Sequence, residues 1–185
     1  LGAIARDDIR AAERLLLEVV ANTPPGYSNE QEDGGTASIR FWDQASFIHF
    51  VMWEKDHGVE RSINWLPNAY PRAYYYLGFI CVKRKEYFRA VEFLDKGLEL
   101  EPSNPNFKFE KAHALVNTGY HKEALALYEG VNGLGPYVSA RELGVARRGC
   151  GFVLIEMGRL DEAEAAFKSS LEIDPANKIA LSELQ

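Results

Sequence analysis

The sequence lacks the short motifs that mark common catalytic sites. Its 185 residues contain no glycine-rich phosphate loop, no nucleophile elbow, no Cys-x-x-Cys pair and no His-Glu-x-x-His zinc signature. Histidine and cysteine are scarce, with four and two residues. We therefore expect a protein that is not an enzyme and that binds no cofactor and no metal ion.

The scarce residues themselves suggest structural roles. Cys81 and Cys150 stand in separate segments of helical pattern, and free cysteine is often buried, so we expect two buried free thiols. His49 and His57 are eight residues apart, more than two helical turns, among Glu54, Asp56 and Glu60. We interpret this cluster as a solvated charged helix end with one interfacial histidine.

The chain also lacks a basic excess and a long apolar run. Its 21 Lys and Arg residues against 27 Asp and Glu residues give a formal net charge of −6, with the signs interspersed. Nucleic acid is disfavoured as a partner because it would need a basic stripe. The longest apolar stretch, around Phe47 to Trp53, is broken by His49 and is too short to span a membrane. We expect no membrane association and a cytoplasmic location, for a fragment whose true N-terminus is not seen.

What the sequence does contain is a repeated helical pattern. Pro102 and Pro136 close two matching segments and lie 34 residues apart. Pro175 closes a third segment 39 residues later, with the five extra residues expected around 137–143. The matching positions are Tyr74, Leu77, Gly78, Cys81, Ala90, Leu94 and Gly97; then Lys108, Lys111, Ala112, Leu115, Gly119, Ala124, Tyr128 and Val131; then Arg147, Cys150, Gly151, Leu154, Gly158, Ala163, Phe167 and Ser170.

These segments resemble the tetratricopeptide repeat (TPR) family in their period and in the Leu-Gly pair followed by alanine, a large residue and proline. The resemblance implies an all-α, TPR-type α-solenoid of antiparallel helix pairs with an irregular N-terminal helical segment. Small residues should lie where paired helices come closest, Asn104 should cap a helix, and Gly119 and Gly158 should end helices. The expected domains are a partial TPR-like helix at 1–24, an irregular insert at 25–70, repeats at 71–104, 105–138 and 139–177, and the start of a further or capping helix at 178–185.

The register fails between Pro24 and Pro71. Residues 25–35 are polar and acidic and predict a mobile loop, and a long helix is predicted over about 37–56. Residues 63–71 contain two prolines and should be extended, with Trp65 and Leu66 holding this strap against the first full repeat. We expect no sheet of three or more strands.

In the TPR family the inner surface is lined mainly by the first helix of each repeat, so the resemblance implies a protein or peptide partner in a concave groove. Two alternatives remain open: the phenylalanines are ordinary core, or the N-terminal segment occupies the groove of its own chain. The residues expected in the groove are Arg72, Tyr75, Phe79, Lys83, Phe109, His113, Arg148 and Phe152.

One known TPR specificity is disfavoured. TPR domains that bind the C-terminal carboxylate of heat-shock chaperones use lysine, asparagine and arginine side chains. The corresponding places hold Tyr75, Phe79, Glu110, Val145 and Gly149, so the carboxylate clamp is absent.

The leading prediction is therefore a non-enzymatic protein-interaction scaffold. One alternative is a regulatory or substrate-docking region of a larger enzyme. Another is a self-association module that acts through the expected Phe41–Trp53 helix, which is apolar on more than one face.

Overall fold

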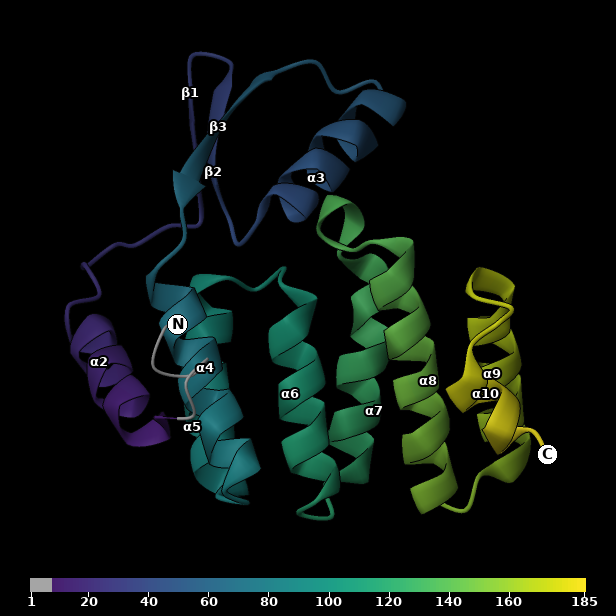
Figure 1. Cartoon of the computed structure of the whole chain (residues 1–185). Coiled ribbons are helices and arrows are strands. Elements are labelled where there is room, and N and C mark those ends of the chain that lie inside the picture. The colour runs from purple at the N-terminus through teal and green to yellow at the C-terminus, as the bar shows by residue number, and fades with distance from the viewer. Residues whose placement is uncertain (1–7) are drawn as a thin grey trace. The chain divides into compact units, whose positions relative to one another are not determined.

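The computed structural model describes residues 8–185, which form helices and one small sheet (Figure 1). Residues 1–7, part of the expected partial repeat, lie outside the described residues. The chain forms two compact units that divide between Ser103 and Asn104. Unit 1 contains α2 (Ile9–Ala21), β1 (Glu30–Asp33), β2 (Thr36–Phe41), α3 (Gln44–Asp56), β3 (Ser62–Pro67), α4 (Tyr70–Lys83) and α5 (Tyr87–Leu100); unit 2 contains α6 (Pro105–Val116), α7 (His121–Glu129), the 3-10 helices η1 (Gly130–Gly133) and η2 (Gly135–Tyr137), α8 (Ala140–Glu156), α9 (Leu160–Ile173) and α10 (Lys178–Glu183).

Most of the long helices pack against the next helix along the chain. In unit 1, α4 packs against α5 and α2 packs against α4. In unit 2, α6 packs against α7, α8 against α9, and α7 and α6 both contact α8. The predicted all-α architecture of helix hairpins is confirmed for residues 71–175.

The repeat extends to individual backbone hydrogen bonds. After α4, the Glu86 N–H donates to Cys81 O at 2.9 Å. The same bond, also 2.9 Å long, follows α6 from Tyr120 to Leu115 and α8 from Arg159 to Leu154. Because the donors are spaced by 34 and then 39 residues, the register read from the prolines holds at the helix ends.

Glycine in the left-handed region ends two of these helices, as predicted. Gly119 has φ +84° and Gly158 has φ +72°. The equivalent residue after α4 is Lys85, whose φ is +61°. Among the described residues, Lys85 is the one residue other than glycine that has a positive φ. At the N-terminal end of α6, the Asn104 side chain accepts a hydrogen bond from Asn106 N–H at 3.0 Å, which confirms the predicted cap.

The five additional residues of the third segment lie before and within the start of α8. The helix begins at Ala140, where Ser139 and Glu142 form a capping box. The Ser139 N–H donates to Glu142 Oε2 at 2.8 Å, and the Glu142 N–H donates to Ser139 Oγ at 3.3 Å. This cap stabilises an N-terminal turn that α6 does not have.

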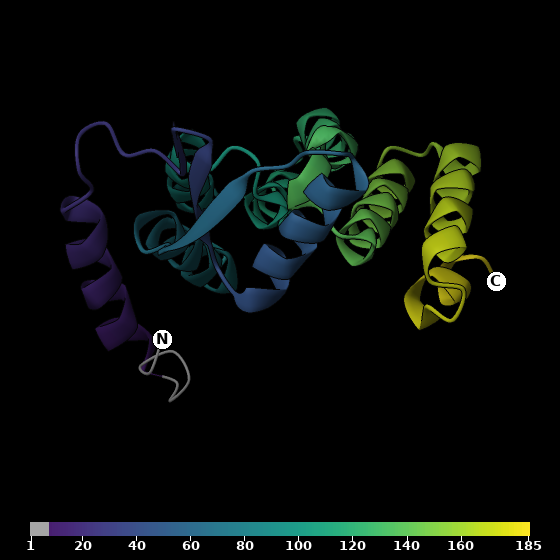
Figure 2. The same ribbon diagram turned by 90° about the horizontal axis from the view of Figure 1, so that it is seen from above.

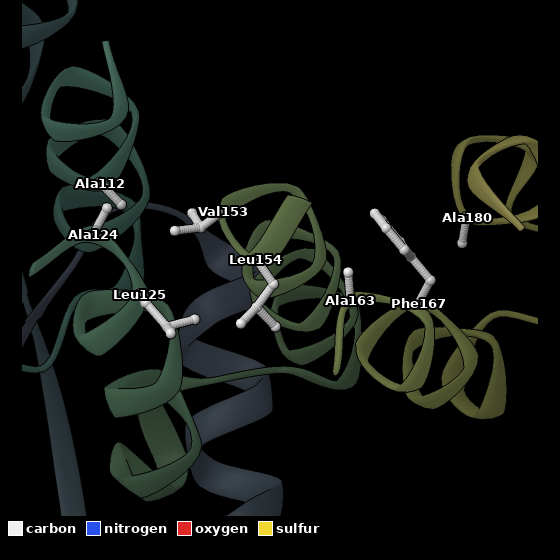
Figure 3. Packing of buried hydrophobic residues seen from close by; sticks show 8 residues of the cluster. All are labelled: Ala112, Ala124, Leu125, Val153, Leu154, Ala163, Phe167 and Ala180. Atoms are coloured by element: carbon white, nitrogen blue, oxygen red, sulfur yellow. The ribbon is translucent and has the colours of Figure 1, made fainter. Parts of the chain in front are cut away.

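Small residues lie at the close helix contacts, as expected. Ala90, Ala112, Ala124 and Ala163 are buried, and a Cβ added to Gly78 would lie 2.6 Å from Leu94 Cγ. In unit 2, Figure 3 shows the buried core side chains following one another from α6 and α7 through α8 to α9 and α10. This core consists of Ala112, Ala124, Leu125, Val153, Leu154, Ala163, Phe167 and Ala180.

Residues 30–67 correct three of the predictions. The predicted loop at 25–35 contains β1, and the predicted helix at 37–56 divides into β2 and α3. β2 pairs antiparallel with β1 and parallel with β3, so unit 1 contains a three-stranded sheet where we expected none. Figures 1 and 2 show α3 running beside this sheet as the connection between β2 and β3. The predicted extended strap is confirmed as β3.

An aromatic cluster joins the sheet to α3. Ala37, Ile39 and Phe41 are buried on one face of β2, and the Phe41 ring lies 5.3 Å from the Phe50 ring of α3. Trp65 of β3 stacks on Phe47 of α3, so it anchors the sheet to α3. The prediction that Trp65 holds the strap against the first repeat is therefore wrong.

The helix end at Glu54 is less solvated than predicted. Glu54 is buried and receives hydrogen bonds from Arg61 Nε at 3.0 Å and Nη2 at 2.6 Å. Arg61 Nη1 also pairs with Glu30 of β1 at 3.0 Å. The hydrogen bonds that Arg61 donates to the Glu54 carboxylate raise the pKa of Arg61 above its usual value. This ion-pair network ties β1, α3 and the start of β3 together.

Among residues 8–185, no helix combines the length and the apolar character needed to cross a bilayer.

Candidate functional site

The four groove residues predicted in unit 1 follow one another along α4. The Tyr75 and Phe79 rings stack with centroids 6.5 Å apart, and Lys83 Nζ lies 5.1 Å from the Phe79 ring centroid. Arg72 lies one turn before Tyr75. The spacing of three or four residues places all four on one side of the helix, and the ring and cation contacts connect three of them.

Trp42 covers the N-terminal half of this row. Its ring lies 5.0 Å from the Tyr75 ring at an interplanar angle of 69°. Arg72 Nη1 donates to Trp42 O at 2.9 Å, and the Arg72 guanidinium lies 5.9 Å from the Trp42 ring. The segment before α4 therefore covers Arg72 and Tyr75 through Trp42. Such a contact is what we would expect if the N-terminal segment occupied the groove of its own chain.

A buried polar junction holds Trp42 in this position. Trp42 Nε1 donates to Glu101 Oε2 at 2.8 Å, and Asn68 Nδ2 donates to the same oxygen at 3.1 Å. Glu101, just after α5, is only 5% exposed. Nearby, burial raises the pKa of Tyr27 to about 12, with a smaller contribution from the charge of Glu101.

The sequence did contain a signal that Trp42 lies outside the helix. Asp43 is the N-cap of α3, and its Oδ1 accepts a hydrogen bond from Ser46 N–H at 2.8 Å. An Asp before a helical segment is a start signal, so the helix could not have included residues 41 and 42. The alternating pattern Thr-Ala-Ser-Ile-Arg-Phe before it is that of a half-buried strand.

In unit 2, Phe109 is half-buried against neighbouring side chains. Its ring stacks on Tyr128 with centroids 6.0 Å apart. It also packs against the buried cluster of Val131, Val138 and Ala146. Its ring is therefore less available to a partner than that of an exposed residue, and its place in the groove stays a prediction.

The other three predicted residues of unit 2 are accessible on α6 and α8, which contact each other. His113 of α6 is exposed, Arg148 of α8 is half-buried, and Phe152 of α8 is 41% exposed. The Phe152 ring meets Phe167 of α9 edge-on at 5.1 Å, which fixes one edge of the ring while leaving the rest accessible. Ile155, one turn after Phe152, is also exposed.

The predicted set thus divides between the units. Arg72, Tyr75, Phe79 and Lys83 belong to unit 1, and Phe109, His113, Arg148 and Phe152 belong to unit 2. A groove shared by all eight residues stays a prediction.

Metal-ligand clusters and free thiols are two kinds of site that the described residues allow us to check. Within residues 8–185, no group of three or more His, Cys, Asp or Glu side chains is placed to hold a metal ion. Cys81 is buried as predicted, whereas Cys150 is half-buried, and both are free thiols. Burial raises the pKa of each thiol to about 11, which disfavours the nucleophilic thiolate.

Comparison with known sequences identifies the repeats. A tetratricopeptide repeat family model matches residues 71–104, and another matches residues 151–177. The chain is 30% identical over 95 residues to the small glutamine-rich tetratricopeptide repeat-containing protein 2 of Mycosarcoma maydis. The match covers 51% of this chain and 26% of that protein, so the chain spans about a quarter of the relative's length.

Solved TPR structures share the fold. The first TPR of Spaghetti (RPAP3), bound to the HSP90 peptide SRMEEVD, has a TM-score of 0.55 and 23% identity, covering 62% of this chain and 86% of that one. The Sgt2 TPR domain from Aspergillus fumigatus has a TM-score of 0.56 and 21% identity, covering 64% and 76%. YrrB, a TPR protein with an unusual peptide-binding site, has a TM-score of 0.55 and 20% identity, covering 75% and 66%.

Proposed function

The chain belongs to the tetratricopeptide repeat family, and from that premise we propose that it is a non-enzymatic scaffold that binds a segment of a partner protein on the first helices of its repeats. The observation that carries this proposal is Phe152, a large aromatic side chain that is 41% exposed on α8. Aromatic residues and arginine are enriched in protein interfaces, where a few residues carry most of the binding energy.

The charges around Phe152 and Phe79 define the preferred partner. Arg148 lies one turn before Phe152, and Lys83 lies 5.1 Å from the Phe79 ring. Both basic side chains accompany an aromatic one, so the partner segment should combine apolar anchors with acidic flanks. Arg72 and Tyr75 already contact Trp42 and are less available to a partner.

The partner should not be recognised by a free C-terminal carboxylate alone. The positions of the chaperone clamp hold Tyr75, Phe79, Glu110, Val145 and Gly149, which offer no cation. Gly149 is buried, and a Cβ added there would lie 2.3 Å from Tyr128 Cε1, so a larger basic residue could not replace it without repacking. We infer that an internal segment of the partner is bound.

The test compares partner binding by the wild-type chain and by two phenylalanine variants, each immobilised for affinity capture. Phe152→Ala should lose the partner, because truncation of an aromatic anchor costs ~2 kcal/mol or more in binding. The matched control is Phe88→Ala on α5, a second helix of a repeat, where the ring is 68% exposed. Partners captured by the wild-type chain are identified by mass spectrometry, and their dissociation constants are then measured by calorimetry.

The result that supports the proposal is weaker binding to Phe152→Ala with unchanged binding to Phe88→Ala, while both variants unfold at the wild-type temperature. Equal binding by all three proteins would show that the α8 surface is not the site. Phe109→Ala is unsuitable for this test, because Phe109 packs against a buried cluster and its loss would also destabilise unit 2.

A further inference from the structure

The sheet of unit 1 has two outer edges that differ in charge. Among the described residues the strand order is β1-β2-β3, so β1 and β3 each pair on one side. β1 reads Glu-Gln-Glu-Asp, and charges of this kind commonly protect an edge from pairing with another strand. β3 reads Ser-Ile-Asn-Trp-Leu-Pro and contains no charge, so this edge lacks the same protection.

The backbone direction of β3 shows which groups face its outer edge. The Ser62 N–H donates to Gly35 O, on the β2 side, at 3.3 Å. Along a strand the N–H and C=O groups of successive residues alternate between the two sides. Asn64 and Leu66 therefore bond toward β2, and Ile63 and Trp65 present their N–H and C=O groups outward.

We propose that the β3 edge pairs antiparallel with the β3 edge of a second copy of this chain, which joins two three-stranded sheets into one. This surface is separate from the proposed binding site on the repeat helices. A two-fold axis at Asn64 places Ile63 of each copy opposite Trp65 of the other. The two residues then exchange N–H···O=C bonds in both directions, so the outward N–H groups of Ile63 and Trp65 are all satisfied.

The side chains favour the same register. Trp65 lies on the α3 side of the sheet, stacked on Phe47, and Ile63 shares that side because it is two residues away. The axis therefore sets an aromatic side chain against a β-branched one, a favourable cross-strand pair. On the other side, Leu66 faces Ser62 of the second copy and Asn64 faces its own equivalent.

The ends of the strand limit the pairing and keep like charges apart. Pro67 has no N–H, so the ladder stops there. Arg61, which would lie opposite Pro67, is held by Glu54 and Glu30 within its own copy. The two-fold register pairs Ile63 with Trp65 in both directions and opposes no like charges along the strand, and this self-complementarity is why a second copy is the occupant that the observations favour.

Sedimentation equilibrium over a concentration series from micromolar to millimolar tests the proposal. The average mass should rise from 20.8 kDa toward twice that value. Asn64→Lys places two ammonium groups on directly opposed positions, where Cβ atoms lie about 4.5–5.5 Å apart, and should weaken the dimer about tenfold or more. Asn64 is exposed, so the monomer should remain folded. The matched control is Gln31→Lys, an exposed residue of β1 with the same change of charge, which should leave the dimer intact.

Amide hydrogen exchange provides a second measurement that does not depend on a variant. The Ile63 and Trp65 amides should exchange more slowly as concentration rises, whereas the Asn64 and Leu66 amides should be unaffected. A chain that stays monomeric at every concentration overturns the proposal, even if a strand from another protein protects the same amides. A dimer that persists in Asn64→Lys also overturns it. If Met52→Lys, on the exposed face of α3, dissociates that dimer, then the dimer forms through α3.

Discussion

The indole Nε1 of Trp42 donates a hydrogen bond to Glu101 Oε2 at 2.8 Å, which joins the residue after β2 to the residue after α5. Glu101 is nearly inaccessible, so its carboxylate depends on protein donors to replace water. Through this bond and the Arg72 contact, the sheet segment and the first repeat stabilise each other.

Trp42→Phe should therefore lower the free energy of unfolding of the chain. The substitution keeps an aromatic ring beside Tyr75 but removes a donor to a buried charged group, a loss of about 1.5–3 kcal/mol. The control is Trp65→Phe, whose Nε1 donates to the neutral Phe41 O at 3.3 Å and whose side chain is 42% exposed. Urea unfolding followed by circular dichroism measures both. Equal losses for the two variants would contradict the special role of the Trp42–Glu101 bond.

Lys85→Gly should stabilise the first repeat. Lys85 has φ +61°, where a Cβ costs roughly 1–2 kcal/mol, and the equivalent positions after α6 and α8 are the glycines 119 and 158. The added chain entropy of glycine offsets part of the gain, so we expect a net increase of about 0.5–1 kcal/mol. Gly119→Ala should have the opposite sign. Denaturant midpoints that move together in one direction for both variants would be inconsistent with this account.

Gly149→Ala should destabilise unit 2, although alanine is the better helix former by about 1 kcal/mol. The new Cβ would lie 2.3–2.6 Å from three atoms of the Tyr128 ring, which is stacked on Phe109 and cannot move freely. Overpacking of this kind costs about 1–3 kcal/mol. Gly133→Ala is the control, since nothing lies within 4 Å of its added Cβ and its φ is not positive. An unchanged unfolding temperature for Gly149→Ala would contradict this prediction, because it would show that the Tyr128 ring can move away without loss of stability.

Stability should fall as the pH rises from about 10 to 12, in part because of Tyr128. Burial raises the pKa of this phenol from 10.0 to about 12. In that window the unfolded chain releases the proton while the folded chain still holds it, so ionisation favours unfolding. Tyr128→Phe should therefore make the free energy of unfolding less dependent on pH, and adding Tyr27→Phe should reduce the dependence further because burial also raises the pKa of Tyr27 to about 12. Urea titrations at several pH values within the window check this, and parallel curves for wild type and both variants would refute it.

The helical repeats were predictable because their signals are local and recur. The proline spacing, the small residues and the left-handed glycines each constrain a helix end or a helix contact, and the hydrogen bonds after α4, α6 and α8 repeat the same spacing. Phe109 shows the limit of this reasoning. Its position in the repeat marked it for the groove, but whether its ring faces solvent or Tyr128 depends on residues distant in the sequence.

The segment at 30–56 was misassigned because strand pairing is decided by distant partners. Its apolar residues fit a helix as well as a strand when read alone, and the N-cap Asp43 was the local signal that separated them. By itself, the sequence determined the repeat pattern, the helix pairs and the register of residues 71–175, since those features arise from contacts within a repeat. Only the tertiary structure decided that Trp42 covers Arg72 and Tyr75, that Phe109 is half-buried against Tyr128 while Phe152 is exposed, and that β3 is an outer strand of the sheet in the described residues. These outcomes depend on burial and hydrogen bonding between segments distant in the chain, which no local pattern encodes.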